Sequence, residues 1–111
     1  MEAGRLPELF CGFPRERDRG PISYPVACSP QAWSAASILG VVGSALGITF
    51  DCSKQQICFK RPMLPSWLTM IELSNLRLGD ASADLVLERS DDSVAVHVVR
   101  RHGPLTVSLT T

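Results

Sequence analysis

The chain has 111 residues, of which 45% are hydrophobic and 20% charged, a balance typical of one globular domain and unlike that of a disordered chain. Eleven basic and eleven acidic residues cancel to a formal net charge of zero, so no overall field attracts nucleic acid or an anionic membrane surface. We therefore expect neither a nucleic-acid partner nor a membrane partner.

Four cysteines and two histidines limit the metal and redox chemistry of the chain. The cysteines have no C-x-x-C spacing, and His97 and His102 lie far from all of them along the chain, so the pattern predicts no metal site. No cofactor is expected. No basic segment followed by an apolar one opens the chain, which favours a cytoplasmic protein with reduced thiols, with a small loop closed by Cys52 and Cys58 as the alternative.

Residues 1–29 are expected to form an irregular arm. They hold four of the eight prolines and the charged cluster RERDRG at 15–20, and proline favours loops because it fixes φ and lacks an N–H donor. A short helical turn is expected at 7–11. Glu8, in that turn, has two interpretations: a catalytic carboxylate, or a solvated charge at a helix end.

Residues 30–47 are expected to form one long buried helix, with Ser29 as N-cap, Pro30 at the first helical position and Gly47 just past the end. The run contains too many glycines and polar residues for a membrane span. Its apolar residues surround the whole circumference: Trp33, Ala35, Ala36, Ile38, Leu39, Val41, Val42, Ala45 and Leu46. Such a helix must be covered on every side. We therefore expect a larger protein around it or self-association, a plain two-layer domain being the alternative.

Residues 48–111 are expected to form the β region, because the hydrophobic period changes to two. Strands are predicted near 56–61, 69–78, 83–89, 93–100 and 105–110. They predict an α+β fold in which the helix packs on one antiparallel sheet of four or five strands. The phase of the apolar residues slips at Ser74-Asn75, which predicts a β-bulge. Trp67 is expected to fill the space where the strands meet the helix.

The segment PELF, followed by a basic, proline-rich loop and then by GPISYPVACSPQAWSAAS, resembles the C-terminal end of the amylo-alpha-1,6-glucosidase-like family, relatives of glycogen debranching enzymes. The resemblance covers most of the chain and is most specific over residues 24–37. It implies that residues 1–29 end an alpha/alpha toroid catalytic domain, that 30–47 are its last helix, and that 48–111 are a C-terminal β appendage. Because Met1 directly precedes sequence of mid-domain character, we expect a piece of a longer enzyme, either excised or left by a truncated gene.

The resemblance also implies an activity, the inverting hydrolysis of α-glucosidic bonds in glycogen-like oligosaccharides, with Glu8 as general base. Tyr24, Gln31 and Trp33 are candidate substrate-binding residues, although Trp33 is also a plausible core residue and Gln31 a plausible capping residue. An inverting hydrolase needs a second carboxylate as general acid. This chain has no second acid in a comparable motif, so we expect an upstream toroid to supply it and the isolated chain to be inactive.

Two other functions remain open from the residues alone. The first is a non-catalytic structural or carbohydrate-binding β module. The second is a hydrolase with a cysteine nucleophile, which is disfavoured because neither histidine lies in a motif that pairs it with a thiol. The family pattern tends to have an aspartate where this chain has Cys11-Gly12, so the natural glucan stays unspecified.

Overall fold

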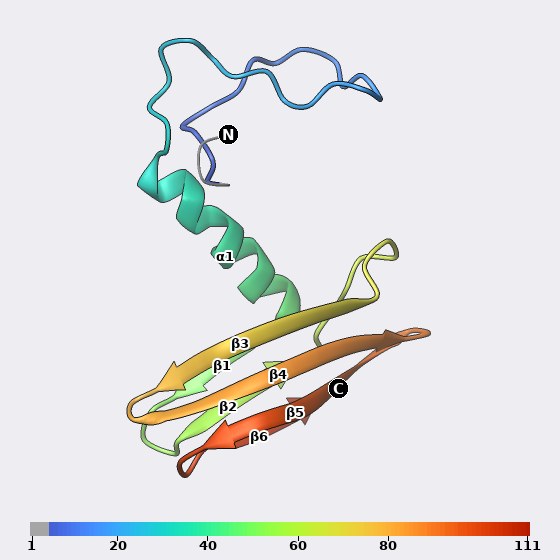
Figure 1. Cartoon of the computed structure of the whole chain (residues 1–111). Helices are drawn as coiled ribbons and strands as arrows, with labels where there is room; N and C mark the ends of the chain where they lie inside the picture. Colours follow the sequence, from blue (N-terminus) through green and yellow to red (C-terminus); the bar gives the residue numbers. More distant parts are fainter. Residues whose placement is uncertain (1–4) are drawn as a thin grey trace. The chain divides into compact units, whose positions relative to one another are not determined.

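A computed structural model describes residues 5–111 (Figure 1). The elements are α1 (Ala32–Leu46), β1 (Ile48–Asp51), β2 (Gln56–Lys60), β3 (Met70–Leu78), β4 (Ala81–Ser90), β5 (Ser93–His102) and β6 (Thr106–Thr110). This composition confirms the predicted α+β class. The chain divides within α1 into two compact units, which we name the arm unit (described from residue 5 to 41) and the β unit (42–111).

The β unit contains two three-stranded sheets, with strand orders β1-β2-β6 and β3-β4-β5. The prediction of one antiparallel sheet with four or five strands is therefore wrong. β6 pairs in parallel with β2 and does not form a hairpin with β5. The chain crosses between the sheets at 103–105, where Gly103 has a positive φ of 80° and Leu105 is buried.

The core of the β unit lies between these two sheets, one of which is behind the other in Figure 1. β4 alternates strictly along its first seven residues, so every second side chain points inward. From the other sheet, β2 contributes Ile57 and Phe59. The buried apolar residues of the core are Leu46, Ile57, Phe59, Leu64, Leu78, Ala81, Ala83, Leu85, Leu87, Val94 and Leu105.

Two irregularities of the β3-β4-β5 sheet meet at one residue of β4. Between the pairs formed by Leu73 and Leu76, β3 holds two residues where β4 holds only Asp84, so the predicted bulge at Ser74-Asn75 is confirmed. On the other side of β4, the register with β5 shifts between Asp84 and Leu85. Both bulges bend their strands where this carboxylate lies.

The helix departs from prediction at its start and in its burial. It begins at Ala32, and the carbonyl of Gln31 accepts the first helical hydrogen bond from the Ala35 N–H, at 2.9 Å, so Gln31 and not Ser29 occupies the N-cap position. Its end is as predicted, since Gly47 follows Leu46 with a φ of 55°. An added Cβ there would collide with the carbonyl of Lys60.

Neither the arm unit nor the β unit by itself buries the part of α1 that it contains. Of the residues of α1 only Ser34 and Leu46 are buried, whereas Trp33 is 62% exposed and Leu39 76% exposed. No helix among residues 5–111 is both long and apolar enough to cross a bilayer.

Three smaller expectations are also corrected. Residues 7–11 contain a bend at Glu8 and a bridge residue at Phe10 and form no helical turn, and β1 is a strand that periodicity missed. Trp67 fills no internal space, since it is 79% exposed. Cys52 and Cys58 close no loop, because both are free thiols.

Candidate functional site

The arm unit is organised by hydrogen bonds between the segment around Glu8 and the segment that leads into α1. The N–H of Glu8 donates to the carbonyl of Cys28 at 2.8 Å. In return, the N–H of Cys28 donates to Oε2 of Glu8 at 3.3 Å. These two bonds hold the backbone and the carboxylate of Glu8 to one residue that lies twenty positions away in the sequence.

The same two segments pair over a longer stretch. Phe10 and Ser23 form an antiparallel bridge, and the N–H of Cys11 donates to the carbonyl of Ile22 at 2.9 Å. At the other end, the N–H of Gln31 donates to the carbonyl of Leu6 at 3.1 Å. The motif PELF is thus joined to the motif that begins α1, although a proline-rich loop separates them in the sequence.

The other predicted binding residues occupy different parts of this arrangement. Gln31 joins the arm to the helix through its backbone, as described, which favours its capping interpretation. Trp33 lies in the first turn of α1 with most of its side chain exposed, so it is not a core residue of the arm unit. Tyr24 lies in a turn in which its carbonyl accepts a bond from the Ala27 N–H at 3.1 Å. Within residues 5–41, no hydrogen bond joins the side chains of these three residues to Glu8.

Glu8 can act chemically as an anchored acceptor. Its side chain is only partly covered, and among the described residues Oε2 has the Cys28 N–H as donor while Oε1 has none. One oxygen therefore fixes the orientation of the carboxylate, and the other can accept a proton from water. A positioned carboxylate of this kind is what general base catalysis requires.

A hollow of about 660 Å³ lies next to this pairing, in the loop between Cys11 and Ile22. Phe13, Arg15 and Arg19 are among the residues that line it, and Glu8 is not. The hollow has the size of a small-molecule site. It belongs to the arm loop alone and contains no second acid apart from Glu16, which pairs with Arg19 at 3.5 Å.

Sequence reasoning missed the partner of Glu8 and one charged cluster. No sequence pattern pointed to Cys28, because it contacts Glu8 through its backbone atoms, which every residue type has. The cluster is centred on Asp84, whose Oδ1 accepts the N–H of Asn75 at 2.7 Å and whose Oδ2 pairs with Arg100 at 2.6 Å. The sequence signal for this cluster was the phase slip at Ser74-Asn75. The bulge there directs the backbone N–H of Asn75 to Asp84 on β4.

The hydrogen bond from the Asn75 N–H and, after it, the charge of Arg100 lower the pKa of Asp84, against the opposing effect of desolvation. The Asp84 side chain is only 17% exposed, so both partners reach it with little competition from water. Both partners favour the ionised carboxylate. Through its bonds to Asn75 of β3 and Arg100 of β5, this carboxylate stabilises both bulges at one position of the sheet.

A pH-dependent stability follows for this cluster. A carboxylate whose pKa is lower when folded stabilises the fold fully above its unfolded pKa of about 3.9, and loses that contribution as pH falls through the folded pKa. The free energy of unfolding of wild type should therefore approach that of Asp84→Asn as pH is lowered from about 6 to about 2. Urea titrations at each pH measure the difference. Arg100→Gln, which keeps the Asn75 bond, should retain most of the pH dependence; a constant wild-type advantage at all pH values would contradict this assignment.

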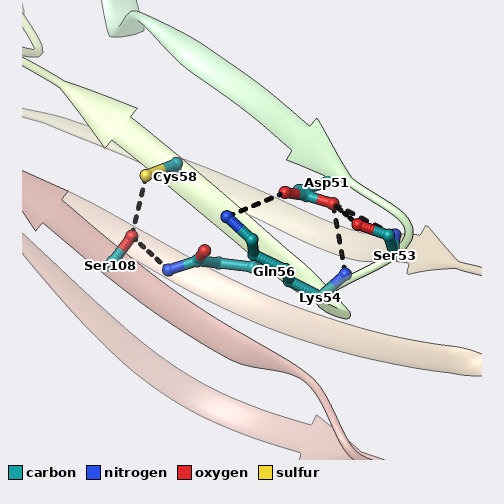
Figure 2. Close-up of polar contacts among 6 residues, drawn as sticks. All are labelled: Asp51, Ser53, Lys54, Gln56, Cys58 and Ser108. Carbon is teal, nitrogen blue, oxygen red and sulfur yellow. Dashed lines mark hydrogen bonds and ion pairs between the residues drawn. The ribbon is translucent and has the colours of Figure 1, made fainter.

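A second polar network lies on the β1-β2-β6 sheet (Figure 2). Oδ1 of Asp51 accepts the Ser53 hydroxyl at 2.6 Å and the N–H groups of Ser53 and Lys54, and these bonds, the hydroxyl first, lower the pKa of Asp51. Across the parallel pair, the Oγ of Ser108 accepts the Gln56 amide at 3.0 Å and lies 2.8 Å from the Cys58 Sγ. These contacts close the β1-β2 turn and tie β2 to β6, which is a structural role.

Within residues 5–111, no group of three or more His, Cys, Asp or Glu side chains is arranged to hold a metal ion. The strongest site is therefore the anchored Glu8 of the arm unit. No protein-family model, no curated protein and no solved structure matches the chain.

Proposed function

We propose that this chain is the C-terminal part of an inverting glycoside hydrolase that acts on α-glucosidic bonds of glycogen-like oligosaccharides, with Glu8 as its general base. The observation that carries the proposal is the two-way hydrogen bonding between Glu8 and Cys28. It joins the two sequence segments on which the family resemblance rests. A resemblance between unconnected segments would be weaker support.

The proposed chemistry divides the work between two carboxylates. A general acid protonates the leaving oxygen, while the general base removes a proton from the water that attacks the opposite face of the sugar, the two groups being ~6.5–9.5 Å apart. Glu8 fits the second role because its Oε2 is anchored by the Cys28 N–H. The acid would come from the upstream toroid, which would also complete the substrate cleft beside Tyr24 and Trp33.

The exposed apolar side chains of α1 also support a longer parent protein. Leu39 and Val41, both largely exposed, follow Ile38 on the part of the helix that belongs to the arm unit. Covering this apolar surface with another element would stabilise the protein by ~25 cal/mol for each Å² buried. Upstream helices of a toroid would cover them.

The isolated chain is expected to hydrolyse no glycoside. Without an acid partner the leaving group is not protonated, and that step typically contributes about 10²- to 10⁴-fold to the rate. Release of glucose from maltooligosaccharides by the purified chain is the measurement. Enzyme-like turnover that disappears in Glu8→Gln would show that the chain needs no upstream domain.

The isolated chain is also expected to self-associate. Exposed apolar surface tends to find partners, and Ile38, Leu39 and Val41 leave apolar side chains exposed around α1. Light scattering across a concentration series should show oligomers, which Leu39→Lys should reduce. A strict monomer at high concentration would count against the uncovered helix and against the longer parent.

The sequence immediately upstream of this chain in its genome tests the proposal without any protein chemistry. Several hundred residues of helical repeats, with a carboxylate in a conserved-looking motif, are the expected result. An intergenic gap would rule out the toroid parent.

A second candidate is a non-catalytic structural or carbohydrate-binding β module. The observation that favours it is the core of the β unit, which draws on both of its sheets. A β unit with its own hydrophobic core can serve as a structural or binding module without containing an active site. If the upstream sequence lacks a toroid, this candidate becomes the better one.

A further inference from the structure

We propose that the open edge of β5 is an interface at which two copies of this chain pair antiparallel and join their β3-β4-β5 sheets. Within residues 5–111, β5 is the longest strand at a sheet edge, with ten residues, and it pairs with β4 on one side only. The backbone N–H and C=O groups on its other side can bond a further strand. The inference does not depend on the role of Glu8.

The first six residues of β5 form the regular part of this edge. The register with β4 shifts between Asp84 and Leu85, so Val99 is the extra residue of a bulge in β5. A bulge bends an edge strand and hinders pairing beyond it. We therefore place the pairing at residues 93–98 of each copy.

The charges at the two ends of β5 favour a second copy as the partner. Asp91 and Asp92 form the turn before β5, and Arg101 and His102 end the strand. None of these four side chains belongs to an ion pair in the part of the chain that the structure describes. Arg101 is held in place by a bond to the carbonyl of Leu105 at 3.1 Å, which leaves its charge uncompensated.

Antiparallel pairing matches these charges between the copies. It brings the acidic turn of one copy beside the basic strand end of the other, and the two-fold axis repeats the match at both ends of the interface. Parallel pairing would instead place like charges together, which costs affinity. The strand is thus complementary to itself in one orientation.

An apolar side chain at the same edge gives the second copy surface to cover. Val98 lies opposite Leu85 in the register with β4, and cross-strand partners share a face of the sheet. Leu85 is completely buried, whereas Val98 is 46% exposed, so the core face reaches the edge without full cover. The other edge of this sheet, β3, is less suited, because the bulge at Ser74-Asn75 divides it in the middle.

Sedimentation equilibrium of the full chain measures the dimer, in a background of Leu39→Lys that suppresses association through α1. Val98→Lys should raise the dissociation constant of the dimer at least about tenfold, because it places a charge on the core face of the edge. Met70→Lys is the control, since Met70 is 52% exposed on the other edge strand, β3. It should leave the dissociation constant unchanged.

An exchange of charges tests the antiparallel alignment. Asp92→Lys and Arg101→Glu should each raise the dissociation constant at least about tenfold, and the double variant should return it to within about threefold of the background. Within one copy an extended strand separates the two residues by roughly 30 Å, so no contact inside a copy can explain such a recovery. Circular dichroism of each variant checks that the fold is kept.

Amide hydrogen exchange locates the interface without any substitution in β5. The amides of residues 93–98 should exchange more slowly as protein concentration rises, while those of β3 should not change. A background chain that stays monomeric at about 1 mM, equal losses in Met70→Lys, or a double variant as weak as its single variants would each overturn the interface. None of these results bears on Glu8, whose role is tested by turnover.

Discussion

In the longer hydrolase that we propose, replacing Glu8 with Gln is expected to lower kcat by roughly 10²- to 10⁴-fold while leaving the stability nearly unchanged. Gln has the same shape and can still accept the Cys28 N–H through its amide oxygen, so the pairing of the arm segments survives. It cannot remove a proton from water at neutral pH. Steady-state hydrolysis of maltooligosaccharides and urea unfolding of the same samples measure the two quantities separately.

Glu16→Gln is the matched control for this experiment. Glu16 lies in the same arm, on an exposed loop, and pairs only with Arg19. A surface pair of this kind contributes about 0–1 kcal/mol, so neither turnover nor stability should change much. If Glu8→Gln kept kcat within a factor of about three of wild type, Glu8 would not be the general base. Because residues 7–11 are not helical, the rival interpretation of Glu8 becomes that of a solvated surface charge away from any helix end.

Phe59→Ala is expected to lower the free energy of unfolding by about 3–5 kcal/mol, the usual cost of removing a buried aromatic side chain. Phe59 is completely buried on β2, between the two sheets of the β unit. Since domains are stable by only about 5–15 kcal/mol, this change would remove a large fraction of the stability of the fold. Thermal and urea unfolding followed by circular dichroism measure the loss.

Phe50→Ala is the control, since Phe50 is on the neighbouring strand β1 but is 48% exposed. It should cost about 1 kcal/mol or less, because surface substitutions rarely have larger effects. Equal effects of the two substitutions would contradict a core located between the sheets.

Local features of the fold were predictable from the sequence, and pairings between distant segments were not. The bulge at Ser74-Asn75 follows from a phase slip within one strand, and the helix end at Gly47 follows from a single residue type. The parallel pairing of β2 with β6 joins segments fifty residues apart, and period-two alternation carries no information on the partner. β1 has only four residues directly after a helix, too few to establish a period.

The candidate site was predictable only in its residue types. PELF and its neighbours identify Glu8, but nothing in the spacing indicates that Cys28 anchors it, since the contact uses backbone atoms and a twenty-residue loop. The start of α1 shows a similar limit. Ser29 and Pro30 match the usual N-terminal preferences, yet the helix begins at Ala32, because the Gln31 N–H is already bonded to Leu6 and its carbonyl takes the capping position.

The configuration of the first sugar released by the proposed full-length hydrolase tests the proposed mechanism most directly. A general base that activates water on the face opposite the leaving group must invert the anomeric centre. Proton NMR during early hydrolysis of a maltooligosaccharide should therefore show β-glucose before mutarotation mixes the anomers, and Glu8→Gln should abolish that signal. Release of α-glucose, which would require a covalent intermediate and a nucleophile in place of a base, would contradict the account.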